Sequence, residues 1–132
     1  IVAGGGVTLV NLAGGLKVSG ADSIAAGRQI LKDALKQPFL QIMRNAGLNA
    51  DALLAQVEAG KAGFCVNVMK PENELVDVKK AGVIDPARVT KEAVQNAVSI
   101  ASTAATMGAL VVDVPEPEAP AAPGGMPGMG MM

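Results

Sequence analysis

Several residue types that build functional sites are scarce in this chain. Its 132 residues include no histidine, tryptophan or tyrosine, two phenylalanines and a single cysteine, Cys65. Without histidine and with one thiol, the chain has neither a zinc cluster nor a disulfide framework of its own. One unpaired cysteine also fits a reducing compartment.

The sequence also lacks an excess of charge and long apolar runs. Eleven Lys and Arg residues against twelve Asp and Glu residues give a formal net charge of −1, which predicts neither nucleic acid nor an anionic membrane as a partner. The apolar runs are short and broken by glycine or charge, so we expect no transmembrane helix and no signal peptide.

Small aliphatic residues are abundant instead. The chain is 50% hydrophobic but only 2% aromatic, a composition that favours close-packed helices in one small domain. This apolar content, together with a start at Ile1 inside an apolar stretch, is typical of a piece of a longer polypeptide whose other parts cover some of its faces.

Apolar spacing and capping residues predict a series of helices. The first follows Gly4–Gly6, which stand at its entrance. Asp22 or Ser23 caps the second, and Pro38 ends it or opens the third. Gly47 closes the third helix in the left-handed cap position.

A fourth helix is capped by Asn49. ENELVDVKK, residues 72–80, is expected to form two helical turns. The clearest helix then starts with Asp85 as its cap and Pro86 as its first residue. Its apolar residues recur at helical spacing and are Val89, Ala93, Ala97, Ile100, Ala104 and Met107.

Two short segments have strand composition. GFCVNVM, residues 63–69, precedes a predicted turn at KPEN, and Leu110–Val114 is an apolar strand without an obvious partner in the chain. From Pro115 the sequence is rich in proline, glycine and methionine and has no periodicity. We therefore predict a domain over residues 1–114 and a disordered tail over residues 115–132.

Taken alone, the candidate site residues have simple structural interpretations. Gly4–Gly6 before a helix are able to bring backbone amides close to an anion, but a tight packing turn explains them equally well. Asp85 is interpreted first as a cap and Asn67 as a turn former. Cys65 is interpreted as a small buried hydrophobe, because no histidine is present to act as its base.

The methionines of the tail offer a different chemistry. Thioethers are soft ligands for Cu(I), so a copper carrier is one hypothesis, although a flexible tail without Cys or His is a poor site. Methionine is also suited to loose contact with many apolar surfaces. The methionines concerned are Met126, Met129, Met131 and Met132.

The order of the segments resembles the C-terminal part of a group I chaperonin of the bacterial GroEL type. The similar segments are VAGGGVTLV, GRQILKDALKQPFLQIMRNAG, AGVIDPARVTKEAVQNAVSIASTAATMGALVVDVPE and GGMPGMGMM. The resemblance covers essentially the whole chain. It implies a mainly α fold, the C-terminal half of an equatorial-domain helical bundle, with one or two short strands and a disordered tail.

The resemblance also implies ATP as a cofactor and assigns roles to the candidate residues. Gly5, with Gly4 and Gly6, would contact the nucleotide, and Asp85 of GVIDP would contact the nucleoside. The family motif G-[YF]-[ND]-A near the base is altered here. Asn67 is our assignment for the base contact, and Cys65 is the other alignment.

Other parts implied by the resemblance fall outside this chain. They include the phosphate-binding loop, the Mg²⁺ ligand, the aspartate that assists hydrolysis and the apical domain. The chain alone is therefore expected not to hydrolyse ATP. The parent would be a cytoplasmic stress-response chaperone, a homo-oligomer of seven-membered double rings that binds a cochaperonin and unfolded polypeptide, with the tail facing the central cavity. The alternative is a non-catalytic helical interaction module.

Overall fold

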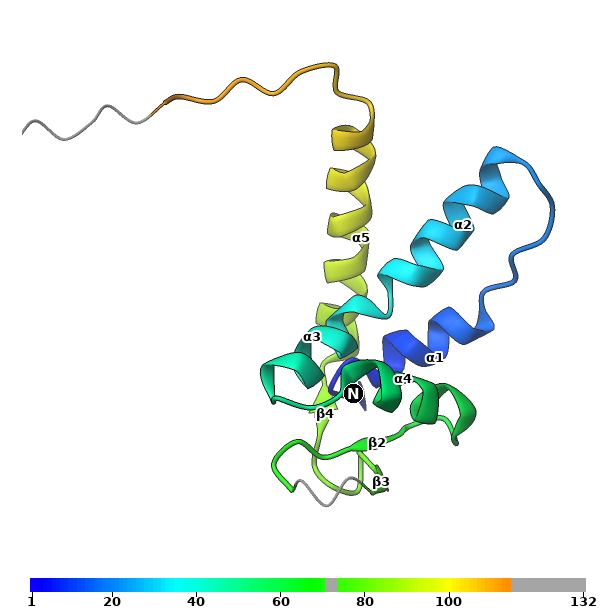
Figure 1. The fold of residues 1–132 in the computed structure, drawn as a ribbon, viewed down its shortest axis with the longest axis vertical. Coiled ribbons are helices and arrows are strands. Elements are labelled where there is room, and N and C mark those ends of the chain that lie inside the picture. Colours follow the sequence, from blue (N-terminus) through cyan, green and yellow to red (C-terminus); the bar gives the residue numbers. More distant parts are fainter. Residues whose placement is uncertain (71–73, 115–132) are drawn as a thin grey trace, which may run out of the picture.

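A computed structural model of the chain describes residues 1–70 and 74–114, and a helical body with two small sheets occupies most of them (Figure 1). The helices are α1 Val7–Gly15, α2 Ser23–Ala34, α3 Gln37–Asn45, α4 Ala50–Ala59 and α5 Ala87–Ala105. The strands are β1 Val2–Ala3, β2 Phe64–Val66, β3 Leu75–Asp77 and β4 Ile84–Asp85. The mainly α fold expected from the sequence is confirmed.

The helix boundaries follow the predicted capping residues. The Asp22 carboxylate accepts a hydrogen bond from the Ala25 amide at 2.8 Å, and the Asn49 side chain accepts one from the Ala52 amide at 3.2 Å. Pro38 lies in the first turn of α3, and Gly47 follows that helix with φ +72°. Each cap satisfies an amide or carbonyl group that the helix end leaves without a partner.

The segment around Leu75–Asp77 corrects a prediction. Instead of two helical turns it forms β3, which pairs antiparallel with β2 in the register Phe64 to Asp77 and Val66 to Leu75. One turn follows the strand, in which the Asp77 carboxylate accepts hydrogen bonds from the Lys79 and Lys80 amides at 3.1 and 3.3 Å. Pairing with β2, nine to thirteen positions earlier in the chain, outweighs the local helical tendency, because it satisfies backbone groups of both segments.

The start of α5 differs from the prediction as well. The helix begins at Ala87 with Pro86 as its N-cap, and no side chain caps it. Asp85 lies in β4, opposite Val2 of β1. The position of Asp85 before a proline predicted a helix cap. In the structure Asp85 is instead part of a strand pair.

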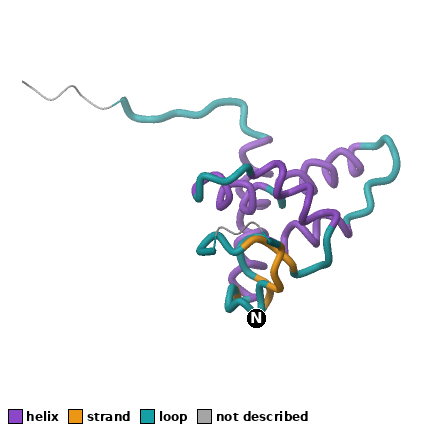
Figure 2. Tube along the Cα trace, turned by 60° about the horizontal axis from the view of Figure 1, so that its bottom comes forward, coloured by secondary structure: helices purple, strands orange, loops and turns teal. Residues whose placement is uncertain are grey.

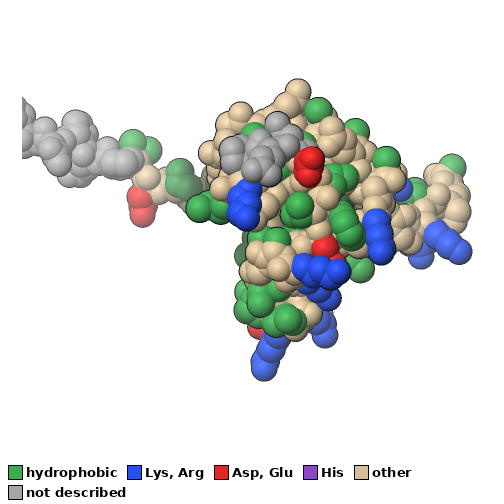
Figure 3. Space-filling view, turned by 90° about the horizontal axis from the view of Figure 1, so that it is seen from below, with side chains coloured by type: hydrophobic (Ala, Val, Ile, Leu, Met, Phe, Trp, Pro, Cys, Tyr) green, Lys and Arg blue, Asp and Glu red, His purple; other side chains and the backbone are tan. Residues whose placement is uncertain are grey.

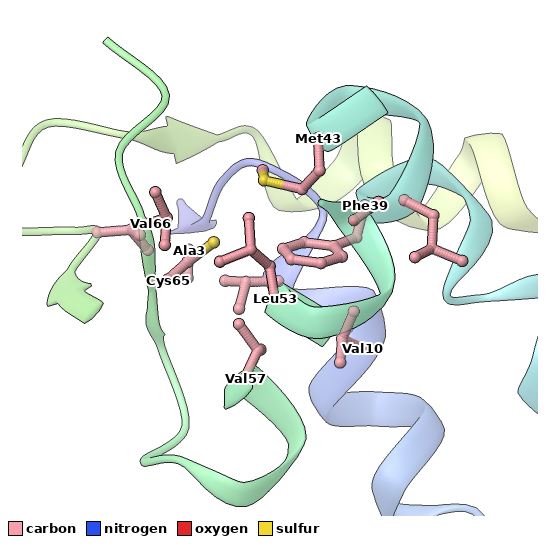
Figure 4. Close-up of a cluster of buried hydrophobic side chains, with 12 residues drawn as sticks. Ala3, Val10, Phe39, Met43, Leu53, Val57, Cys65 and Val66 are labelled. Carbon is pink, nitrogen blue, oxygen red and sulfur yellow. The ribbon is translucent and has the colours of Figure 1, made fainter. Parts of the chain in front are cut away.

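The buried core lies where α1, α3 and α4 meet the β2–β3 hairpin. Phe39, completely buried, points into its centre between Val10, Met43 and Leu53 (Figure 4). Cys65 lies in the same cluster and is 2% exposed, which confirms its interpretation as a buried hydrophobe. Burial raises the pKa of its thiol, because the thiolate loses hydration there.

α5 projects from this body and contributes no buried residue (Figure 1). The apolar stripe predicted on it is exposed, with Val89 at 62% and Ile100 at 71%. The Thr90–Val94 side of the helix faces an apolar groove of about 400 Å³ shared with leucines of α1 and α2. Half of this amphipathic helix thus has no covering layer among the described residues.

Leu110–Val114 forms no strand with any described segment, and its apolar side chains are 69–93% exposed. The Pro71–Asn73 part of the predicted turn lies outside the described residues. The predicted disordered tail, with the methionines of the copper hypothesis, lies outside them too.

The surface charges and the lengths of the helices bear on nucleic acid and membranes as partners. On the face seen in Figure 3, the Lys and Arg side chains lie in several places among hydrophobic and other side chains. Within residues 1–70 and 74–114, no helix combines the length and the apolar character needed to cross a membrane.

Candidate functional site

The predicted glycine turn and Asp85 lie together at the β1–β4 pair. The register places Val2 opposite Asp85 and Ala3 opposite Ile84, and the Gly4 amide donates to the Val83 carbonyl at 3.0 Å. Figure 2 shows the strands gathered beside the N-terminus, with the helices behind them. Segments about eighty positions apart in the sequence are thereby joined at one edge of the molecule.

The three glycines have different surroundings. A Cβ on Gly4 would lie 3.0 Å from the Ile84 backbone nitrogen, and one on Gly6 would lie 2.9 Å from the Phe39 backbone. A Cβ on Gly5 would meet only the Val83 side chain, at 3.7 Å. Packing therefore explains Gly4 and Gly6, whereas Gly5 is the member of the turn with space for an approaching ligand.

The backbone of the turn offers donors. Gly5 and Gly6 directly precede α1 and have φ +69° and +79°. Outside helices and strands, the amides of these two residues donate to no backbone acceptor among the described residues. Amides of this kind at a helix N-terminus favour an anion or an oxygen acceptor.

Asn67 directly follows β2 and lies apart from the glycine turn and Asp85. Its Oδ1 accepts a hydrogen bond from the Met69 amide at 3.0 Å, which leaves the Nδ2 group free of that turn. It lines a cavity of about 180 Å³ with Lys70, Glu74, Val76 and Ala81, and the lining includes neither the glycine turn nor Asp85. Cys65, the other alignment, is buried in the core.

The hairpin is nevertheless tied to the glycine turn through the backbone. The Val83 amide donates to the Val78 carbonyl at 2.8 Å, and the Val78 amide donates to the Gly63 carbonyl at 3.1 Å. With the bond from Gly4 to Val83, these contacts form a continuous connection from the turn to the base of β2.

Sequence reasoning missed two residues that shape the turn. Phe39 packs its backbone against Gly6, and the Thr8 hydroxyl donates to the Ala3 carbonyl at 2.7 Å across the turn. A threonine two residues after a glycine run is a sequence signal for the second contact. Nothing in the local sequence indicates the first, because α3 is thirty residues away.

Comparison with known proteins identifies the family of this chain. A sequence model of the TCP-1/cpn60 chaperonin family matches residues 1–114. The protein named Chaperonin GroEL 1 of Prochlorococcus marinus strain MIT 9215 is 40% identical over 131 residues, which cover 97% of this chain and 22% of that protein. The protein of the same name from strain MIT 9312 is 40% identical over 128 residues, 95% of this chain and 21% of that protein.

The chain thus spans about a fifth of the length of the curated relatives it matches. The family match extends over both sheets and all five helices of the described structure. On these grounds the chain belongs to the TCP-1/cpn60 chaperonin family.

Proposed function

We propose that this chain is the C-terminal half of the equatorial domain of an ATP-dependent protein-folding chaperonin and supplies part of its nucleotide pocket. The observation that carries the proposal is the β1–β4 pair, which joins the glycine turn to Asp85. ATP presents ribose hydroxyls and phosphates. The Gly5 and Gly6 amides would offer donors to such a ligand, and the Asp85 carboxylate on the adjoining strand pair would offer an acceptor.

Each residue has a distinct task in this proposal. Gly5 lets the nucleotide approach the backbone, while Gly4 and Gly6 allow the close packing that holds the turn in place. The half-exposed Asp85 carboxylate would accept hydrogen bonds from the ribose hydroxyls. Asn67 remains our proposed base contact through its Nδ2 group, and from its separate cavity it would reach the base only after a movement of the β2–β3 hairpin.

Mg²⁺ does not fit the described residues by themselves. Among residues 1–70 and 74–114 there is no group of three His, Cys, Asp or Glu side chains placed to hold a metal ion. The metal ligands and the groups that promote hydrolysis would come from parts of the parent outside this chain. The 132-residue chain alone is therefore expected to show no ATP turnover.

The nucleotide site is tested by two substitutions in the full-length parent. Gly5→Asp would place a carboxylate where the nucleotide approaches, and Asp85→Ala would remove the acceptor for the ribose. Each is expected to weaken ATP binding about tenfold or more, the effect of losing or opposing a charge-assisted hydrogen bond. Isothermal titration calorimetry on the assembled protein measures this change.

Two matched variants control for strain and charge. Gly47→Asp has a similar positive φ and no neighbour within 4 Å of its Cβ, so it reproduces the backbone strain of Gly5→Asp away from the site. Asp51→Ala removes an exposed carboxylate from the first turn of α4, away from the proposed nucleotide site. If Gly5→Asp and Asp85→Ala bind ATP as these controls do, the assigned site is wrong.

We further propose that the uncovered apolar surfaces are contact surfaces in the ring. The exposed Leu110–Val114 segment would pair with a strand of a neighbouring subunit, and the residues from Pro115 onward would face the central cavity. The exposed stripe of α5 and the apolar groove would be covered by the rest of the parent. Cochaperonin and unfolded polypeptide would bind mainly through other domains of the parent. The parent would act in the bacterial cytoplasm.

In this proposal ATP acts by shifting populations. Nucleotide bound at the glycine turn would change the relative populations of two states of the ring, one that accepts substrate and one that encapsulates it. The backbone hydrogen bonds from Gly4 through Val83 and Val78 to Gly63 would connect the turn to the hairpin during such a change.

Ile100→Asp tests the covered face. In the 132-residue chain Ile100 is 71% exposed, so the substitution is expected to change the free energy of unfolding by less than about 0.5 kcal/mol. In the full-length protein it would bury an unpaired carboxylate, with an expected loss of about 3 kcal/mol or failure of assembly. Urea unfolding and sedimentation velocity measure the two effects.

Glu92→Asp, on the polar side of the same helix, is the control and is expected to be neutral in both settings. Equal effects of Ile100→Asp in the short and the full-length protein would show that the α5 stripe stays exposed in the assembly.

A further inference from the structure

The Thr8 hydroxyl connects the two ends of the glycine turn. Thr8 is the second residue of α1, and its Oγ1 donates to the carbonyl of Ala3, the last residue of β1, at 2.7 Å. The bond is partly buried and spans five residues. Gly4, Gly5 and Gly6 all lie inside the loop that it closes.

The Ala3 carbonyl needs this donor. In an antiparallel pair, hydrogen-bonded and non-hydrogen-bonded residue pairs alternate. The bond from the Gly4 amide to the Val83 carbonyl makes Ala3 and Ile84 a non-hydrogen-bonded pair, so the Ala3 carbonyl points away from β4. Ala3 is 6% exposed, and a buried carbonyl without a partner is destabilising.

No other side-chain hydrogen bond within the described part of the chain spans the turn. Its N-cap residue is Gly6, which has no side chain to cap α1. Three consecutive glycines also carry more backbone freedom than any other residues. A hydroxyl reaching back from the first helical turn thus limits motion at the point where the backbone is least restrained.

We propose that Thr8 is a positioning residue for nucleotide binding, which holds the glycine turn in the conformation that presents the Gly5 amide. The inference rests on the proposed ATP site, because the turn is its binding element. Thr8 itself touches no nucleotide in this proposal. It acts by fixing the distance between β1, whose partner strand carries Asp85, and the start of α1.

The test uses the full-length assembled protein with Thr8→Val, which keeps the shape of the side chain and removes the donor. ATP affinity is expected to fall about fivefold. Hydrogen exchange without nucleotide is expected to speed up about fivefold at the Gly4, Leu9 and Val10 amides, which are hydrogen-bonded in and beside the turn. Thr8→Ser restores the hydroxyl and is expected to return both values to within about twofold of the parent.

Thr103→Val is the matched control. The Thr103 hydroxyl donates to the Ser99 carbonyl at 3.1 Å within exposed α5, so its removal takes away a similar bond far from the turn. It is expected to change neither ATP affinity nor exchange at the turn.

Each outcome decides the role of Thr8. Faster exchange with unchanged ATP affinity would reduce Thr8 to a structural residue and overturn the proposal, as would no change in either measurement. If the parent itself does not bind ATP, the proposed function fails, whereas the exchange data still show whether Thr8 restrains the turn. Should Thr8→Val not assemble, Thr8→Ala against Thr8→Ser supplies the same comparison.

Discussion

Gly6→Ala is expected to destabilise the chain by about 3 kcal/mol, the largest effect of any single added methyl group in this structure. The new Cβ would lie 2.9 Å from both the Cα and the backbone nitrogen of Phe39, and Gly6 has φ +79°. Neither backbone yields easily, so overpacking and left-handed strain, each worth about 1–3 kcal/mol, combine. Urea unfolding followed by circular dichroism measures the change.

Two glycine variants separate these causes. Gly5→Ala has a similar positive φ but meets only the Val83 side chain at 3.7 Å, so it is expected to cost about 1–2 kcal/mol from strain alone. Gly27→Ala, inside α2 with nothing within 4 Å, is expected to stabilise the chain by up to about 1 kcal/mol. A Gly6→Ala variant as stable as Gly5→Ala would contradict the close contact between Gly6 and α3.

Phe39→Ala is expected to cost about 3–5 kcal/mol, because it empties the centre of the core. The ring is completely buried and lies between side chains of α1, α3 and α4 (Figure 4). Removal of the ring leaves a cavity that helices joined by short loops close only in part. The same denaturation experiment measures the loss as a lower urea midpoint.

Val89→Ala is the control for this core substitution. It also truncates an apolar side chain, but Val89 is 62% exposed on α5, so a change within about 0.5 kcal/mol is expected. If the two variants lost similar stability, the body around Phe39 would not be the principal core of this chain.

The helical half of the fold was predictable because its signals are local. An Asp or Asn side chain caps amides two or three residues away, and a proline restricts its own φ, so Asp22, Pro38 and Asn49 act without distant partners. Gly47 likewise adopts its positive φ at a helix end. These residues place α2, α3 and α4 almost where the sequence indicated.

The errors occur where a distant partner competes with a local tendency. Leu75–Asp77 pairs with β2 instead of forming helical turns, and Asp85 pairs with Val2 instead of capping α5. The apolar stripe of α5 was predicted correctly in its spacing, yet the structure leaves it exposed. Periodicity shows which face of a helix is apolar, but only the neighbouring elements determine whether that face is covered.

The sequence by itself determined α2, α3 and α4 with their capping residues, the resemblance to chaperonins and the choice of Gly4–Gly6 and Asp85 as candidates. Each of these depends on neighbouring residues or on their order. Only the tertiary structure decided that the glycine turn and Asp85 are joined through β1 and β4, and that Asn67 lies in a separate cavity. It also decided that a Cβ on Gly5, unlike one on Gly4 or Gly6, would approach no backbone atom within 4 Å. The physical reason is that a Cβ contact or a strand partner is set by backbone segments thirty to eighty residues away, whose distance no local pattern encodes.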